Sequence, residues 1–236
     1  MNIEDLYSTR IQKSFDEDQA EIITRLQENS RQQLKLINYY KGIPLSYPAG
    51  IVSINRGALD LDLQETQAFT IQEARSTFIR APFLKYDLFA QAQYVNVRKR
   101  AATFVRFSYV EILAERRNFV RVDLDDRVPV AIQSPSGIVK GILSDLSLSG
   151  LGILLDHISS LAVGAETELS FKLICHESGE PFEVRSQTTV VNIRGDVPPY
   201  SYRFAITPDK FLERHLSQYI FQRQIEIIRQ VKEAVS

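Results

Sequence analysis

Two short polar clusters in the middle of the chain hold the side chains best suited to recognising an anion. The first is "RRNFVR", in which Arg117 and Arg121 lie four positions apart. Arginine stays charged and presents a planar fork of N–H donors that matches phosphate oxygens and the O6 and N7 atoms of guanine. In an extended segment both arginines lie on one face, about 13 Å apart, and in a loop they can converge. Taken alone, this cluster is more typical of a solvated loop than of a binding site.

The second cluster is "DLSLSG", which runs from Asp145 to Gly150. Asp145 can accept hydrogen bonds from the N–H groups of a base, and Ser147 offers a short donor and acceptor. Gly150 lets the backbone turn or a ligand approach closely. In a strand, Asp145, Ser147 and Ser149 share one face. The alternative is purely structural, with Asp145 capping a turn and Ser147 bonded to the local backbone.

The composition limits what these clusters can bind. The net charge is −1 over 236 residues, so the chain has no general field for a nucleic acid polymer or an anionic membrane, and anion binding has to be local. Cys175 is the only cysteine, which suits a reducing compartment, and we predict that it is a packing residue. The three histidines lack the spacing of metal ligands, so no metal site is predicted.

The start of the chain has neither the basic nor the apolar region of a secretory signal. No apolar run approaches the roughly 18 residues of a membrane span. We therefore expect a soluble, cytoplasmic protein.

Helical periodicity is found at both ends of the chain. Residues 1–40 are assigned to an N-terminal helical segment, in which a helix is predicted from residue 3 to about 38. Its apolar stripe consists of Ile11, Phe15, Ile22 and Leu26. A C-terminal helix is predicted at about 207–234, with Thr207 as its N-cap and Pro208 in its first turn.

Short β-branched and alternating runs fill the space between these helices and predict a mainly β fold. We expect two small antiparallel β-barrels, one at 41–111 and one in a second domain at 112–236. A weak internal repeat supports this division, because Gly50 and Ser53 can be aligned with Gly141 and Ser144. Common strand patterning can also produce such matches. The arginine and serine clusters occur only in the second copy.

The spacing Arg117-x-x-x-Arg121 followed by Asp145-x-Ser147-x-x-Gly150 resembles the two-part signature of PilZ domains, which bind cyclic di-GMP (c-di-GMP). The first part is weak alone, since a chain this rich in arginine contains it about once by chance. The second part is rarer, and both parts are intact. The resemblance implies that the arginines hold phosphates and guanine edges, and that the other three residues complete the pocket.

The resemblance covers about residues 112–232, and the layout is similar to flagellar-brake-type PilZ proteins. In those proteins a PilZ-like barrel without the signature precedes the binding barrel. Arg116 directly precedes the motif, and the resemblance implies that a cation there accompanies binding of a stacked pair of c-di-GMP molecules. Arg194 and Arg203, near the later strands of the barrel, are expected to be residues of the sheet surface, and the alternative is that they assist in holding the ligand.

The resemblance therefore implies an effector without catalysis, which changes its interdomain arrangement on ligand binding and regulates a protein partner. The flagellar motor is the natural target for this layout, and control of exopolysaccharide production or another output is also compatible with it. No further cofactor is predicted. The alternative is an adaptor whose barrels dock partner proteins without nucleotide.

Overall fold

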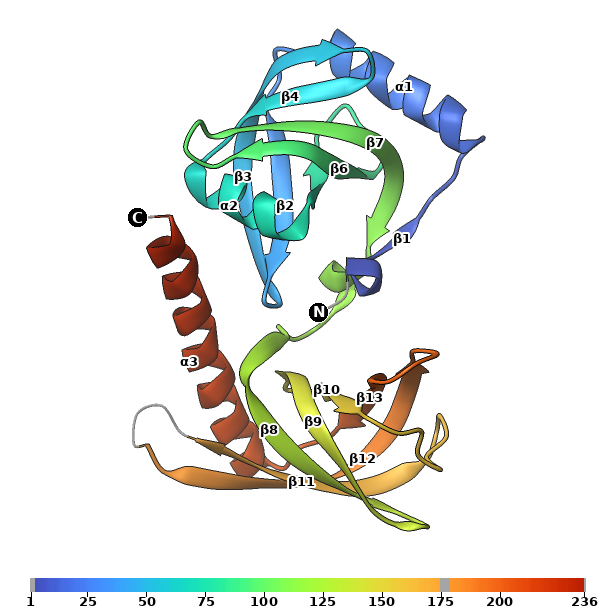
Figure 1. Ribbon diagram of the computed structural model, residues 1–236, viewed down its shortest axis with the longest axis vertical. Coiled ribbons are helices and arrows are strands. Elements are labelled where there is room, and N and C mark those ends of the chain that lie inside the picture. The colour runs from blue at the N-terminus through green and yellow to red at the C-terminus, as the bar shows by residue number, and fades with distance from the viewer. Residues whose placement is uncertain (1–2, 175–178, 236) are drawn as a thin grey trace. The chain divides into compact units, whose positions relative to one another are not determined.

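The computed structural model of the protein describes residues 3–174 and 179–235 and is mainly β-sheet (Figure 1). Cys175 lies outside the described residues, so its packing role stays a prediction. The chain divides into two compact units, Asn2–Arg117 together with Ile227–Ser236, and Asn118–Glu226. The boundary between the units thus falls inside the arginine cluster.

A closed ring of six antiparallel strands forms most of the first unit. Its strands are β2 (Leu34–Tyr40), β3 (Ile43–Asn55), β4 (Ala58–Asp62), β5 (Ser76–Arg80), β6 (Asp87–Asn96) and β7 (Ala101–Ile112). The order of neighbours is β2, β3, β4, β7, β6 and β5, and β5 pairs back with β2 to close the ring. A short strand, β1 (Tyr7–Thr9), pairs with β7. The interior is filled by fully buried side chains that include Leu36, Leu59, Ile79, Leu88, Phe104 and Phe107.

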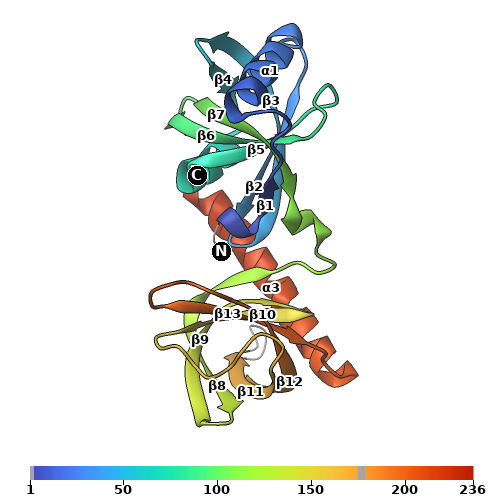
Figure 2. The same cartoon turned by 90° about the vertical axis from the view of Figure 1, so that its right-hand side faces the viewer.

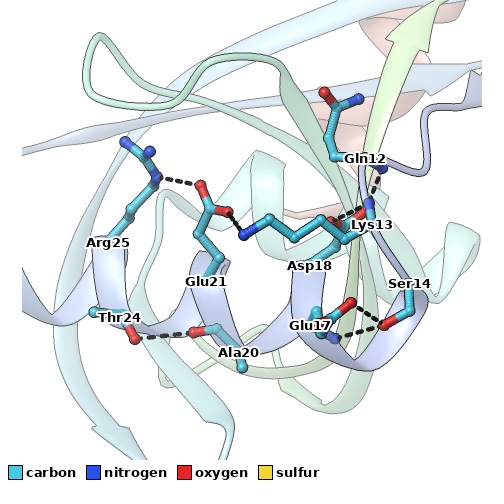
Figure 3. A network of polar contacts seen from close by, with 9 residues as sticks. All are labelled: Gln12, Lys13, Ser14, Glu17, Asp18, Ala20, Glu21, Thr24 and Arg25. Carbon is cyan, nitrogen blue, oxygen red and sulfur yellow. Dashed lines mark hydrogen bonds and ion pairs between the residues drawn. The ribbon is translucent and has the colours of Figure 1, made fainter.

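Two α-helices accompany this barrel, α1 (Phe15–Glu28) and α2 (Glu65–Ala74). Ser14 caps α1: its Oγ accepts a hydrogen bond from the Glu17 backbone N–H at 3.3 Å and donates to Glu17 Oε2 at 2.8 Å (Figure 3). The carboxylate of Asp18, which is buried, accepts the backbone N–H groups of Gln12 and Lys13 (Figure 3). These bonds fix where the helix begins.

The predicted helix over residues 3 to about 38 is wrong at both ends. Because Ser14 is the N-cap, the helix begins at Phe15. Ile11 therefore lies before the helix, and it is 63% exposed. Asn29 caps the other end, where its Nδ2 donates to the Arg25 carbonyl at 2.8 Å. Leu34–Tyr40 is a strand because it pairs on both sides, with β3 and β5.

The second unit is also a closed barrel of six antiparallel strands. They are β8 (Val122–Ser134), β9 (Gly137–Ser147), β10 (Gly150–Leu155), β11 (Glu166–Ile174), β12 (Pro181–Arg194) and β13 (Tyr200–Ile206). The order around the barrel is β8, β9, β10, β13, β12 and β11. Figure 2 shows β10 and β13 side by side, as their antiparallel pairing requires.

The two barrels have the same strand order, which confirms the predicted mainly β fold with two small antiparallel barrels. The predicted alignment of the two copies is one residue out of register. Val52 in β3 and Ser144 in β9 are the extra residues of equivalent β-bulges, so Ser53 corresponds to Asp145 and not to Ser144. Alternating strand patterns match well at several registers, and only the pairing with β4 and β10 identifies the correct one.

The C-terminal helix, α3, spans Lys210–Ala234. Its N-cap is Asp209 and not the predicted Thr207, because Asp209 Oδ1 accepts the backbone N–H of Leu212 at 2.8 Å. Its buried apolar residues are Leu216, Tyr219, Ile220, Ile227 and Val231. None of the helices in the described part of the chain is long and apolar enough to cross a membrane.

Candidate functional site

The "DLSLSG" cluster forms the tip of the hairpin between β9 and β10. Ser147 pairs with Gly150 across a two-residue loop, and the Ser147 hydroxyl, which is buried, donates to the Gly150 carbonyl at 2.9 Å. A Cβ on Gly150 would lie 2.7 Å from the backbone carbonyl oxygen of Phe204, so the close approach of β13 requires glycine here. Both residues therefore shape the hairpin before any ligand is considered.

Asp145 is a buried carboxylate held between two arginines. It is 2% exposed, and its Oδ2 accepts hydrogen bonds from Arg203 Nη1 and, at 2.8 Å, from Ser144 Oγ. Its other oxygen, Oδ1, lies 3.3 Å from Arg121 Nε. Among the described residues, Oδ1 accepts no hydrogen bond of normal geometry. The structure thus brings Arg121 and Asp145 together and leaves one carboxylate oxygen with spare accepting capacity.

Arg203 was not among the predicted site residues, because sequence reasoning favoured the sheet surface for it over a role beside the ligand. Its side chain is 14% exposed and ion-paired with Asp145. The signal that could have identified it is Gly152, a glycine inside β10, since glycine within a strand often marks a close approach. A Cβ on Gly152 would collide with Asp145 Oδ2 and Arg203 Nη1. Arg194, in contrast, is exposed at the end of β12, as predicted.

Arg116 and Arg117 belong to the first unit, at the end of a short 3₁₀ segment (Leu113–Arg116). Arg116 is ion-paired with Glu111, and Arg117 Nη2 donates to the Asp5 carbonyl at 3.4 Å. The six predicted residues are therefore divided between the units, two in the first and four in the second.

A cavity of about 460 Å³ in the first unit is lined in part by Arg116. Its other charged lining residues are Arg10, Arg80, Lys85, Asp87, Glu111 and Glu115. Hydrogen bonds from Arg80 to Asp87 and Glu115 raise the pKa of the Arg80 guanidinium above its usual value. Most of these charges are paired with one another, so the cavity is a network of ion pairs and not a strongly basic pocket.

Comparison with known proteins identifies one domain. The sequence profile of the PilZ domain matches residues 115–222, which include Arg116, Arg117, Arg121 and the whole "DLSLSG" hairpin. None of the curated protein sequences compared with the chain matches it.

Several solved structures are similar to the chain at low sequence identity. The Bacillus subtilis inhibitor of motility MotI/DgrA is 14% identical with a TM-score of 0.44, over 84% of this chain and 98% of that one. Escherichia coli YcgR in complex with c-di-GMP is 17% identical with a TM-score of 0.43, over 99% of both chains. Klebsiella MrkH in complex with c-di-GMP is 13% identical with a TM-score of 0.43, over 94% of this chain and all of that one. The likeness to the PilZ domain rests on the match over residues 115–222 and not on these structures.

Proposed function

Residues 115–222 form a PilZ domain, and from this premise we propose that the chain is an effector that binds c-di-GMP and catalyses no reaction. The observation that carries the proposal is the arrangement around Asp145. A buried carboxylate oxygen with spare accepting capacity lies beside Arg121, which is an arginine of the PilZ signature. This arrangement suits a ligand that combines base N–H donors with phosphate oxygens.

The proposed roles follow the chemistry of each side chain. Arg117 and Arg121 bind phosphate oxygens and the O6 and N7 edge of guanine. Asp145 accepts N–H groups of a guanine, while Ser147 and Gly150 keep the hairpin tip in place. A few charge-assisted hydrogen bonds contribute about 1.5–3 kcal/mol each. After the cost of ordering the arginine segment, about −8 kcal/mol remains, which corresponds to a dissociation constant near 1 μM.

The arginine segment connects the two units, and this supports a way to signal without catalysis. We propose that c-di-GMP orders this segment, and that the ordering changes the arrangement of the barrels and thereby exposes or hides a surface for a protein partner. Regulation of the flagellar motor is the output to test first, with exopolysaccharide control as the second.

Calorimetric titration with c-di-GMP tests the binding site. Arg117→Ala, Arg121→Ala and Asp145→Ala are each expected to weaken binding by about tenfold or more, because each removes a charge-assisted bond. Arg185→Ala is the matched control, since Arg185 makes exposed ion pairs on β12 of the same barrel. Wild-type affinity in all three site variants refutes the site. A titration without heat, together with a stable protein complex formed in the absence of nucleotide, favours the adaptor alternative.

The same titration measures stoichiometry. We propose that Arg116 stacks on a second guanine, so that two c-di-GMP molecules bind per chain. Arg116→Ala is then expected to reduce the ratio from two to one. A ratio of one that is unchanged in this variant rules out the stacked pair.

A further inference from the structure

Three residues on neighbouring strands of the second barrel form a single cross-strand row. Gly152 on β10 is paired with Asp145 on β9 and with Arg203 on β13. Because Gly152 has no side chain, the Asp145 carboxylate and the Arg203 guanidinium meet across the middle strand. The ion pair therefore depends on a glycine that lies outside both parts of the PilZ signature.

The two oxygens of the Asp145 carboxylate have different surroundings. Oδ2 is engaged by barrel residues, through hydrogen bonds from Arg203 and Ser144. Oδ1 is turned toward Arg121, at 3.3 Å from its Nε. Fixing one oxygen fixes the plane of the carboxylate, so the bonds to Oδ2 determine where Oδ1 points.

Arg121 cannot be the sole cation beside this carboxylate while it also binds a ligand. A buried carboxylate needs a paired cation, because an isolated ion in the protein interior is strongly unfavourable. In the proposed function Arg121 turns its donors toward phosphate or guanine. Arg203 lies on a barrel strand, is largely buried and is ion-paired with Asp145, so it can remain the partner of the carboxylate when Arg121 turns away.

The first barrel shows that the fold itself does not require an arginine in this row. Its equivalent residues are Ser53, Asp60 and Thr103, paired in the same way across β3, β4 and β7. There the carboxylate is on the middle strand, and Asp60 accepts a hydrogen bond of 2.6 Å from each neighbouring hydroxyl. The same position in the same topology is thus satisfied without any cation.

We infer that Arg203 is a positioning residue of the ligand site, which holds Oδ2 of Asp145 so that Oδ1 is presented to the ligand. This inference rests on the proposed function. Arg203 itself does not have to touch c-di-GMP, and its effect on binding passes through Asp145.

A double-mutant cycle on the full chain tests this inference, with c-di-GMP affinity measured by calorimetry and folding by thermal unfolding. Arg203→Gln is expected to weaken binding by about tenfold or more, since Oδ2 loses its cation. In the Asp145→Ala background the same change is expected to have no further effect, because there is no carboxylate left to position. Arg203→Lys keeps the charge without the fork and is expected to restore part of the affinity. Arg185→Gln is the control for loss of an exposed arginine.

Each outcome is decisive. If wild-type protein does not bind c-di-GMP, both the proposed function and the inference fail. If wild-type protein binds and Arg203→Gln binds equally well, or its effect is additive with Asp145→Ala, the inference alone is overturned. If Arg203→Gln does not fold, Arg203→Lys decides: weaker binding at normal thermal stability supports positioning, and wild-type affinity overturns it.

Discussion

Gly152→Ala tests the cross-strand row with the smallest possible perturbation. The added methyl group collides with Asp145 Oδ2 and Arg203 Nη1 and lies 2.7 Å from Ser144 Oγ. All three contacts are with side-chain ends, so the backbone of β10 can stay in place while the ion pair is pushed apart. The variant therefore removes the geometry of the pair but neither of its charges.

The expected loss of unfolding free energy is about 1–3 kcal/mol, the usual cost of inserting a methyl group into a packed site. Removing one partner of a buried ion pair costs about 3–5 kcal/mol, and this sets an upper limit here because both partners remain. Affinity for c-di-GMP is expected to fall by about tenfold or more, since Oδ1 is no longer held in its direction.

Denaturant unfolding, followed by circular dichroism, measures the stability change, and calorimetry measures binding. Gly50→Ala is the matched control, because Gly50 is also a strand glycine and no heavy atom lies within 4 Å of the Cβ position. We expect the control to change stability by less than about 0.5 kcal/mol. If Gly152→Ala behaves like this control in both measurements, the ion pair does not depend on the glycine and the reasoning is refuted.

Two further predictions concern stability alone. The hydroxyl groups of Ser53 and Thr103 lower the pKa of Asp60, so the stabilising effect of the Asp60 carboxylate is present above about pH 4, the ordinary pKa of an aspartate, and is lost as the pH falls through the lowered folded value. Asp60→Asn should therefore make the unfolding free energy less dependent on pH in the acid range, and an unchanged pH dependence contradicts this. Arg223 is 4% exposed, donates to the Asp123 carbonyl at 3.1 Å and is ion-paired with Asp125 at 2.7 Å. Arg223→Met should lower the unfolding free energy by about 1–3 kcal/mol, whereas the exposed control Arg229→Met should change it by less than about 0.5 kcal/mol; equal effects of the two changes rule out a structural role for the buried arginine.

The two barrels and the hairpin part of the candidate site could be predicted from the sequence, because both depend on local patterns of residues. The hairpin motif of Asp145 and Ser147 could be located because its spacing is local. The start of α1 could also have been predicted, since Ser14 and Glu17 have the spacing of a capping box in the sequence, and Ser14 does cap the helix. It was missed because the apolar stripe continues past the cap through Ile11.

Arg203 could not be found in the same way. Its partner Asp145 is 58 positions away, and the glycine between them belongs to a third strand. Only the register of three strands brings these residues into one row, and a bulge at Ser144 shifts that register by one position. Residue propensities and motif spacing do not reveal such a shift in strand register.

The comparison of the two rows also bears on the order in which a row held by hydrogen bonds to a carboxylate can become one held by an ion pair. Three exchanges are needed in the first barrel, Ser53→Asp, Asp60→Gly and Thr103→Arg. If the glycine comes first, two hydroxyls lose their shared acceptor, and if the new aspartate comes first, it faces Asp60 directly with like charge. Thr103→Arg is the one first step that neither removes the acceptor of both hydroxyls nor places two carboxylates face to face, because the arginine faces Asp60. A stepwise conversion of the hydrogen-bonded row into an ion-paired row therefore costs least when the arginine is acquired before the aspartate on the neighbouring strand.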